Sequence, residues 1–454
     1  MDTRVSPIPM KSTMSAVFRR LGIDPDEAKG LFRQATAAAI DTRPLAPIIA
    51  VANDFVDRIL SACEKFFTRL FFPTPPVDRV SRLPDALLGN IVSRLPVKEA
   101  ARTAALSRRW RGVWRSAPLV LADADLLPVT STVSSVLAAH PGPFRSVHLT
   151  SSRMAEFHGL LTSWLQILAI KGIEELLLIN GRWPHDLVLL STFLGMATLT
   201  RLHLGLWNVS MENSDLDFIL DRSPVLETLC VEGNLFQLRL RLVSQSLRCV
   251  HIIGSFEQIF VVDAPLLERL IHSEGKDMLE VGNTIIKAGT RVSPGTMVPS
   301  VRILAMELLF NVRNDAKMVP SVLRCFPNVE TLHIKSGETH QSTGKLNLKF
   351  WQESGTIECI RSRIKRLVFR DFRGGRSELA FLKFFFESAL VLKEVVILLA
   401  PGFTSIEEVH SKVASLGSTK APSVLVTGCS DPQRDYIQSF KRGSDFSIRD
   451  PFED

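Results

Sequence analysis

Close cysteine pairs, secretion signals and common enzyme motifs are all missing from this sequence. Its six cysteines stand at least nineteen positions apart, so no CxxC pair is available for zinc or redox chemistry. A disulfide framework is not expected with so few cysteines in 454 residues. We therefore expect a reducing setting, in the cytoplasm or the nucleus.

Signals for secretion or membrane insertion are also lacking. The opening MDTRVSPIPMKSTM has no apolar core of a signal peptide, so we expect no secretion. The apolar stretch LAPIIAVANDFVDRILSACEKFFTRLFF carries charges such as Asp54, Asp57 and Arg58, which argue against a membrane span. Its apolar positions between residues 52 and 70 step by three and four, which predicts an amphipathic helix docked on its own protein. Dimerisation and contact with a membrane surface are the alternatives for this helix.

Catalytic signatures are absent as well. The sequence has no GxSxG, HExxH or GxGxxG. The stretch GETHQSTGKL (residues 337–346) resembles a phosphate loop, but its glycines are seven apart where that loop needs five. Leu346 also replaces the hydroxyl residue that would hold magnesium. We therefore expect a protein that is not an enzyme and needs no cofactor.

What the sequence does have is enough apolar material for large cores. Apolar residues make up 46% of the chain, which excludes wholesale disorder. The net charge of +7 is spread over 454 residues. It is compatible with a nucleic acid, an acidic protein or an ordinary soluble surface.

A Leu-x-x-Leu-x-Leu phrase recurs nine times after about residue 170. The fourth positions of these phrases fall at residues 176, 202, 229, 250, 270, 304, 332, 367 and 395, which are 20 to 35 positions apart. This spacing centres on the period of leucine-rich repeats. Each phrase predicts a short strand whose apolar face is buried only by stacking on its neighbours. The uneven spacing predicts an irregular solenoid.

The stretch SRLPDALLGNIVSRLP contains the tetrapeptide Ser-Arg-Leu-Pro twice. Pro84 suits the start of a helix, and Asp85 complements its dipole. Pro96 disfavours helix at the residue before it and so ends that segment. A second helix is expected in VKEAARTAAL and a third in RRWRGVWRSA, capped by Ser107. Such a small helical unit with surplus apolar surface predicts a partner.

Residues 78–118 closely resemble the F-box of plant F-box proteins. In that family the motif binds the Skp-type adaptor of a cullin–RING ubiquitin ligase, and the rest of the chain recruits a substrate. The resemblance places the adaptor contacts at Leu83, Pro84, Leu87, Leu88, Ile91, Leu95, Pro96, Ala100, Leu106, Ser107, Trp110 and Trp114.

Residues 358–398 resemble the FBD module that follows the F-box and leucine-rich repeats in plant proteins. The pattern is a strand, a glycine-rich turn at residues 372–375, a helix over residues 378–389 and a second strand. The fold class is therefore mixed α/β: a small three-helix F-box, then an irregular leucine-rich-repeat solenoid with parallel strands, continued by the FBD module. The expected domains are an N-terminal extension (1–75), the F-box (78–118), repeats (145–355), the FBD module (356–430) and a polar tail (431–454).

The open face of the solenoid is the expected surface for a protein target. His203, His251 and His333 share one slot between the two strand leucines. Strands about 4.8 Å apart hold His203 and His251 roughly 10 Å apart, too far for one metal. The same surface supplies the other candidate target-binding residues, Arg201, Glu232, Arg269, Lys335 and Arg370. The run RRWRGVWR has the composition of a nucleic-acid patch, but within an F-box its tryptophans have packing roles, so nucleic acid is not expected.

The function expected from the resemblance is substrate recognition in a ubiquitin ligase, with the Skp-type adaptor and an unidentified protein target as partners. The alternative is a leucine-rich-repeat scaffold that binds proteins without a ligase. No membrane partner is expected.

Overall fold

The protein is described by a computed structural model. It describes residues 80, 82–126, 129–151, 158–179, 187–188, 196–205, 209–210, 212–273, 278–338, 344, 347–402, 406–416, 422–428 and 442–450. The chain forms two compact units, residues 1–119 and residues 120–454. The amphipathic helix expected over residues 52–70 lies outside the described residues.

The described part of the first unit contains three short helices, α4 (Asp85–Val92), α5 (Val97–Thr103) and α6 (Arg108–Ser116), as the sequence predicted. Pro84 and Pro96 are the N-cap residues of α4 and α5, both with ψ of 149°. Each Leu-Pro therefore starts a helix, because proline has a fixed φ and needs no hydrogen bond for its missing N–H. Helix α4 ends before it reaches the second proline, since its C-cap residue is Ser93.

The three helices share a small core. Helices α4 and α5 both pack on α6. Among the described residues of the unit, the buried apolar side chains are Leu88, Val92, Val97, Ala100, Val113, Ala117 and Leu119.

The second unit is built on one sheet of fourteen strands in the described part of the chain. From β2 onward, neighbours along the main path are parallel. In spatial order the path is β1 (Leu119–Ala122), β2 (Phe144–Leu149), β3 (Ile173–Ile179), β5 (Arg201–Gly205), β7 (Thr228–Val243), β8 (Cys249–Asp263), β9 (Arg269–Ser273), β12 (Ile303–Leu308), β13 (Thr331–Ser336), β14 (Arg366–Phe372), β15 (Glu394–Leu399) and β16 (Ser423–Thr427). Off this path lie β10 (Met278–Val281) and β11 (Thr284–Ile285), and β4 (Leu187–Val188) pairs with β6 (Val209–Ser210).

The strand register confirms the repeat read from the sequence. All nine phrases form strands, and their fourth residues pair directly with one another from Leu176 in β3 to Val395 in β15. Every residue in this row is at most 4% exposed. One continuous apolar row thus runs across the sheet, and each strand buries its part of the row against the next.

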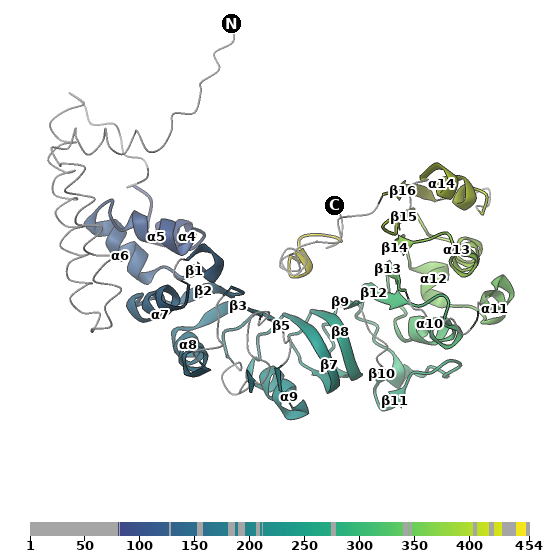
Figure 1. Cartoon of the computed structure of the whole chain (residues 1–454), viewed down its shortest axis with the longest axis horizontal. Coiled ribbons are helices and arrows are strands. Elements are labelled where there is room, and N and C mark those ends of the chain that lie inside the picture. The colour runs from purple at the N-terminus through teal and green to yellow at the C-terminus, as the bar shows by residue number, and fades with distance from the viewer. Residues whose placement is uncertain are drawn as a thin grey trace, which may run out of the picture. The chain divides into compact units, whose positions relative to one another are not determined.

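Helices cover one face of the sheet (Figure 1). They are α7 (Val129–Ala139), α8 (His158–Lys171), α9 (Asn213–Arg222), α10 (Arg313–Cys325), α11 (Leu348–Glu353), α12 (Glu358–Ser362), α13 (Arg376–Ser388) and α14 (Ile406–Ala414), with 3-10 turns η1 (Asp123–Asp125) and η4 (Pro294–Thr296). Because side chains alternate along a strand, the third and fifth residues of each phrase point away from these helices. We call this second surface of the sheet the inner face.

The strand–turn–helix–strand order expected of the FBD module is present as β14, a glycine turn, α13 and β15. Its core is aromatic: Phe381 lies 5.1 Å from Trp351 and 5.6 Å from Phe310 between ring centroids. Glu378, in the first turn of α13, accepts hydrogen bonds from the Gly375 backbone N–H and the Ser336 hydroxyl, both at 2.6 Å. This buried carboxylate therefore ties the helix to β13.

The apolar row continues at both ends into strands that the sequence analysis did not predict. Strand β2, with the sequence FRSVHL, pairs Val147 with Leu176 and so extends the apolar row before the first recognised phrase. Strand β16 extends the row after the last one, pairing Val424 with Val395. Among the described residues, no helix combines the length and apolar character needed to cross a bilayer.

Two adjacent leucines before β9 give a matched test of the repeat register. Leu267 is fully buried and Leu266 is 50% exposed. We expect Leu267→Ala to lower the free energy of unfolding by about 2–5 kcal/mol, because it leaves a cavity, and Leu266→Ala to change it by less than about 0.5 kcal/mol. Urea unfolding followed by circular dichroism measures both. Equal losses in the two variants would contradict the repeat register.

Candidate functional site

The first unit exposes an apolar strip along α4. Pro84 and Leu87 are three positions apart, and Leu87 and Ile91 are four apart, which places all three on one side of the helix. The side chains of Leu87 and Ile91 are 53% and 45% exposed. We call Pro84, Leu87 and Ile91 the α4 strip.

The other predicted adaptor contacts differ in how accessible they are. Leu88 is fully buried, so its side chain packs in the core of the unit, and its role in adaptor binding stays a prediction. Leu106 is 64% exposed at the loop before α6, and Pro96 and Ser107 are also exposed. Half-buried or buried positions are Leu83, Leu95, Trp110, Trp114 and Ala100.

An arginine that the sequence analysis did not single out fixes the α4 strip in place. Arg109 on α6 donates from Nε to Asp85 Oδ1 at 2.7 Å and from its guanidinium to the Leu83 carbonyl. The Ser107 hydroxyl caps α6 by accepting from the Trp110 N–H at 3.4 Å, as predicted. Together these contacts hold the start of α4 against the start of α6.

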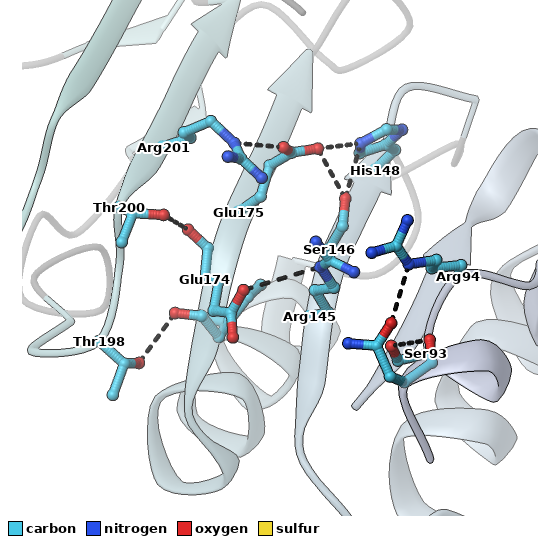
Figure 2. Close-up of polar contacts among 12 residues, drawn as sticks. Ser93, Arg94, Arg145, Ser146, His148, Glu174, Glu175, Thr198, Thr200 and Arg201 are labelled. Carbon is cyan, nitrogen blue, oxygen red and sulfur yellow. Dashed lines mark hydrogen bonds and ion pairs between the residues drawn. The ribbon is translucent and has the colours of Figure 1, made fainter. Parts of the chain in front are cut away.

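The inner face carries a polar cluster at its β2–β5 end, drawn in Figure 2. Glu175 accepts from Ser146 Oγ at 2.7 Å, His148 Nε2 at 2.8 Å and Arg201 Nε at 2.6 Å. Burial alone would raise the pKa of Glu175, but the hydrogen bonds from His148 and Ser146 and the charge of Arg201 lower it to about 2. The cluster therefore holds one buried carboxylate in its ionised form.

The next strands hold more buried polar groups. His203 on β5 lies 3.2 Å from Glu232 on β7, and both are at most 4% exposed. Burial, with smaller contributions from His203 and His272, lowers the pKa of His251 to about 3. His251 is therefore neutral at physiological pH.

The remaining target-binding candidates lie further along the inner face. Lys335 is 3.4 Å from Glu307 and pairs in register with Arg370. Arg269 and His333 are buried under residues 442–450, a segment of the same chain. The eight candidates thus divide between two halves of one face, and their role in target binding stays a prediction.

Sequence reasoning missed several inner-face residues. His148 shares the slot of the three predicted histidines, because it lies between Val147 and Leu149 of β2. Ser146 and Glu175 occupy the inner-face position two residues earlier in their strands, and they pair in register. The available signal was the phrase FRSVHL, which lacks leucine at its first and fourth positions. In the described part of the chain, no three His, Cys, Asp or Glu side chains are grouped so as to hold a metal ion.

Comparison with protein-family models finds all three domains recognised in the sequence. An F-box domain model matches residues 80–121, and an FBD model matches residues 352–397. The model for the LRR repeats of FBD-associated F-box protein At5g56370 matches residues 161–209, 203–278 and 272–334. The F-box, the leucine-rich repeats and the FBD module recognised in the sequence are confirmed.

Several curated plant proteins are similar to this chain. F-box/FBD/LRR-repeat protein At5g22660 of Arabidopsis thaliana is 25% identical over 405 residues, covering 70% of this chain and 89% of that protein. Putative F-box/LRR-repeat protein At3g58880 of the same plant is 27% identical, covering 72% and 93%. F-box/FBD/LRR-repeat protein At2g04230, also from Arabidopsis thaliana, is 33% identical but covers only 22% and 25%.

Glu175 makes acid stability testable. Its pKa is lower in the folded chain than in the unfolded one, so its contribution is complete above pH 4.5 and is lost as pH falls toward 2. We expect Glu175→Gln to lower the free energy of unfolding by up to about 3 kcal/mol at pH 7, and by much less at pH 3. Urea unfolding at both values measures this.

The neighbouring Glu174 provides the control. Its side chain is 53% exposed, at 3.8 Å from Arg145. Glu174→Gln should leave stability nearly unchanged at both pH values. A pH-independent loss in Glu175→Gln would mean that packing, rather than charge, gives Glu175 its importance.

Proposed function

Because this chain carries an F-box domain, leucine-rich repeats and an FBD domain, we propose that it is the substrate-recognition subunit of an SCF-type cullin–RING ubiquitin ligase. F-box domains generally bind Skp-type adaptors in such ligases, and F-box/LRR proteins are generally non-catalytic adaptors. In this proposal the first unit binds the adaptor and the second unit binds a protein target.

The α4 strip is the observation that carries the adaptor half of the proposal. Leu87 and Ile91 are about half exposed, on a helix whose opposite side holds the buried Leu88 and Val92. Removing the remaining exposed surface of such a side chain from water contributes roughly 1 kcal/mol. Leu106 adds a third large exposed apolar side chain in the same unit. These exposed groups do not stabilise the isolated unit. Their burial under an adaptor would stabilise the complex.

The preformed geometry of the strip lowers the cost of binding. Arg109 bonds to Asp85 and to the Leu83 carbonyl, so the start of α4 is already ordered before a partner arrives. Because this segment is ordered before binding, association loses less conformational entropy. Arg109 is therefore a positioning residue for the strip.

The inner face is the proposed target surface. Its polar side chains come from successive strands, which presents charged and neutral groups in a fixed array. The mechanism is proximity: one chain holds adaptor and target together, which raises their effective concentration, and the assembled ligase transfers ubiquitin. No bond-making step is assigned to this chain.

Adaptor binding is tested by placing a charge on the strip. We expect Leu87→Glu combined with Ile91→Glu to weaken binding of the Skp-type adaptor at least 100-fold, because a carboxylate would be buried without a partner. Co-purification and gel filtration of the full chain with the adaptor measure the complex. Leu266→Glu, at an equally exposed leucine of the second unit, should bind like the wild type.

Leu88→Ala separates contact from support. Since Leu88 is fully buried, its loss should weaken adaptor binding together with the thermal stability of the first unit. The strip variant should lose binding with its helical circular dichroism intact. A folded wild-type chain that does not bind the adaptor would overturn the ligase proposal and leave a leucine-rich-repeat scaffold in its place.

A further inference from the structure

Residues 442–450 lie on the inner face of the sheet, on the side away from the helices (yellow in Figure 1). One side chain holds their backbone. Arg269 on β9 donates to the carbonyls of Gly443 at 2.8 Å, Asp445 at 3.1 Å and Ile448 at 2.7 Å. We call residues 442–450 the strap.

The first side-chain anchor of the strap is an aromatic ring. Phe446 packs on the apolar cluster of Cys249, Ile271 and Ala305, which are inner-face residues of β8, β9 and β12. The Arg248 guanidinium lies 3.7 Å from the centre of the Phe446 ring and that of Arg269 lies 4.8 Å from it. The site for this ring is therefore an apolar floor with two cations over it.

The second anchor is a carboxylate. Asp450 is 1% exposed and lies 3.1 Å from His333 Nε2 on β13 and 3.5 Å from the Arg366 guanidinium on β14. Arg366 is also 3.5 Å from Glu394, so it is shared by two carboxylates. A buried carboxylate is tolerated where such partners surround it.

The strap is bound in the manner of a peptide rather than packed as a core element. Asp445, Ser447 and Arg449 are exposed, while the residues between them turn toward the sheet. A cavity of about 320 Å3 remains between the strap and strands β12 to β15, lined by residues such as Ile303 and Thr331. This cavity opens to solvent, so the strap covers that part of the inner face incompletely.

We propose that the inner face from β8 to β14 is a binding site for a target segment with an aromatic residue and, four positions later, a carboxylate. The strap is the intramolecular occupant of this site, and a target segment must displace it. This inference rests on the proposed function, in which the inner face binds a protein target. It adds the chemical class of the segment that binds there. The adaptor is not needed for its test.

A tethered segment competes at a high effective concentration, so an added peptide reaches the site of the wild-type chain only in large excess, and at much lower concentration when the strap is weakened. The probe is a fluorescent peptide with the sequence of residues 442–450, RGSDFSIRD. We expect the full chain with Phe446→Ala and Asp450→Asn to bind it at least tenfold more tightly than the wild type. Fluorescence anisotropy measures both affinities.

Two controls test the anchors and the pocket. A scrambled peptide of the same composition, in which the aromatic residue and the carboxylate no longer stand four apart, should not bind. Adding Arg269→Gln to the weakened-strap variant should remove binding of the original peptide. A folded weakened-strap variant that ignores the peptide would overturn the proposal and leave the strap as a fixed structural brace.

Hydrogen exchange of the wild-type chain covers the case in which the strap variant does not fold. A large excess of the peptide should speed amide exchange in residues 442–450 and leave exchange in β13 slow. Unchanged exchange in the strap at saturating peptide would overturn the proposal. Adaptor binding is unaffected by either result, so failure here is distinguishable from failure of the ligase proposal.

Discussion

The fold of the second unit depends on the burial of one row of aliphatic side chains that crosses its sheet. Each member of the row belongs to a different strand, and no strand is able to bury its own member alone. The parallel register follows from this constraint, because a shift by one residue would turn the row toward the inner face. The array of polar groups on that face is a by-product of the same register.

The two proposed binding surfaces have different physical characters. The α4 strip is apolar and exposed, and its geometry is set by a few local contacts such as Arg109 with Asp85. The inner face combines apolar clusters, such as Cys249, Ile271 and Ala305 under Phe446, with charged groups paired across strands, as Glu175 is with Arg201. The first surface favours tight, general binding, whereas the second selects among partners by the pattern of charge.

The sequence predicted the parts of the fold that are encoded locally. Phrase spacing gave the nine strands, and the two Leu-Pro pairs gave the first-unit helices, because leucine periodicity and proline geometry act over a few residues. It did not reveal that Leu88 faces inward, since Leu87 and Leu88 are chemically identical neighbours and only packing distinguishes them. It also did not reveal the strap. His333 and Asp450 are 117 positions apart, and residues 431–454 read as a polar tail.

Recognition of the strap by Arg269 goes through backbone carbonyls, which every residue type offers. Arg269 therefore holds the backbone of Gly443, Asp445 and Ile448 without reading their side chains. The contact with Arg269 by itself therefore sets no residue type at those three positions across related chains, provided that the backbone path is kept. Phe446 and Asp450 are constrained by the pockets they fill, and a substitution at either is expected to occur together with a change at Arg248 or Arg366.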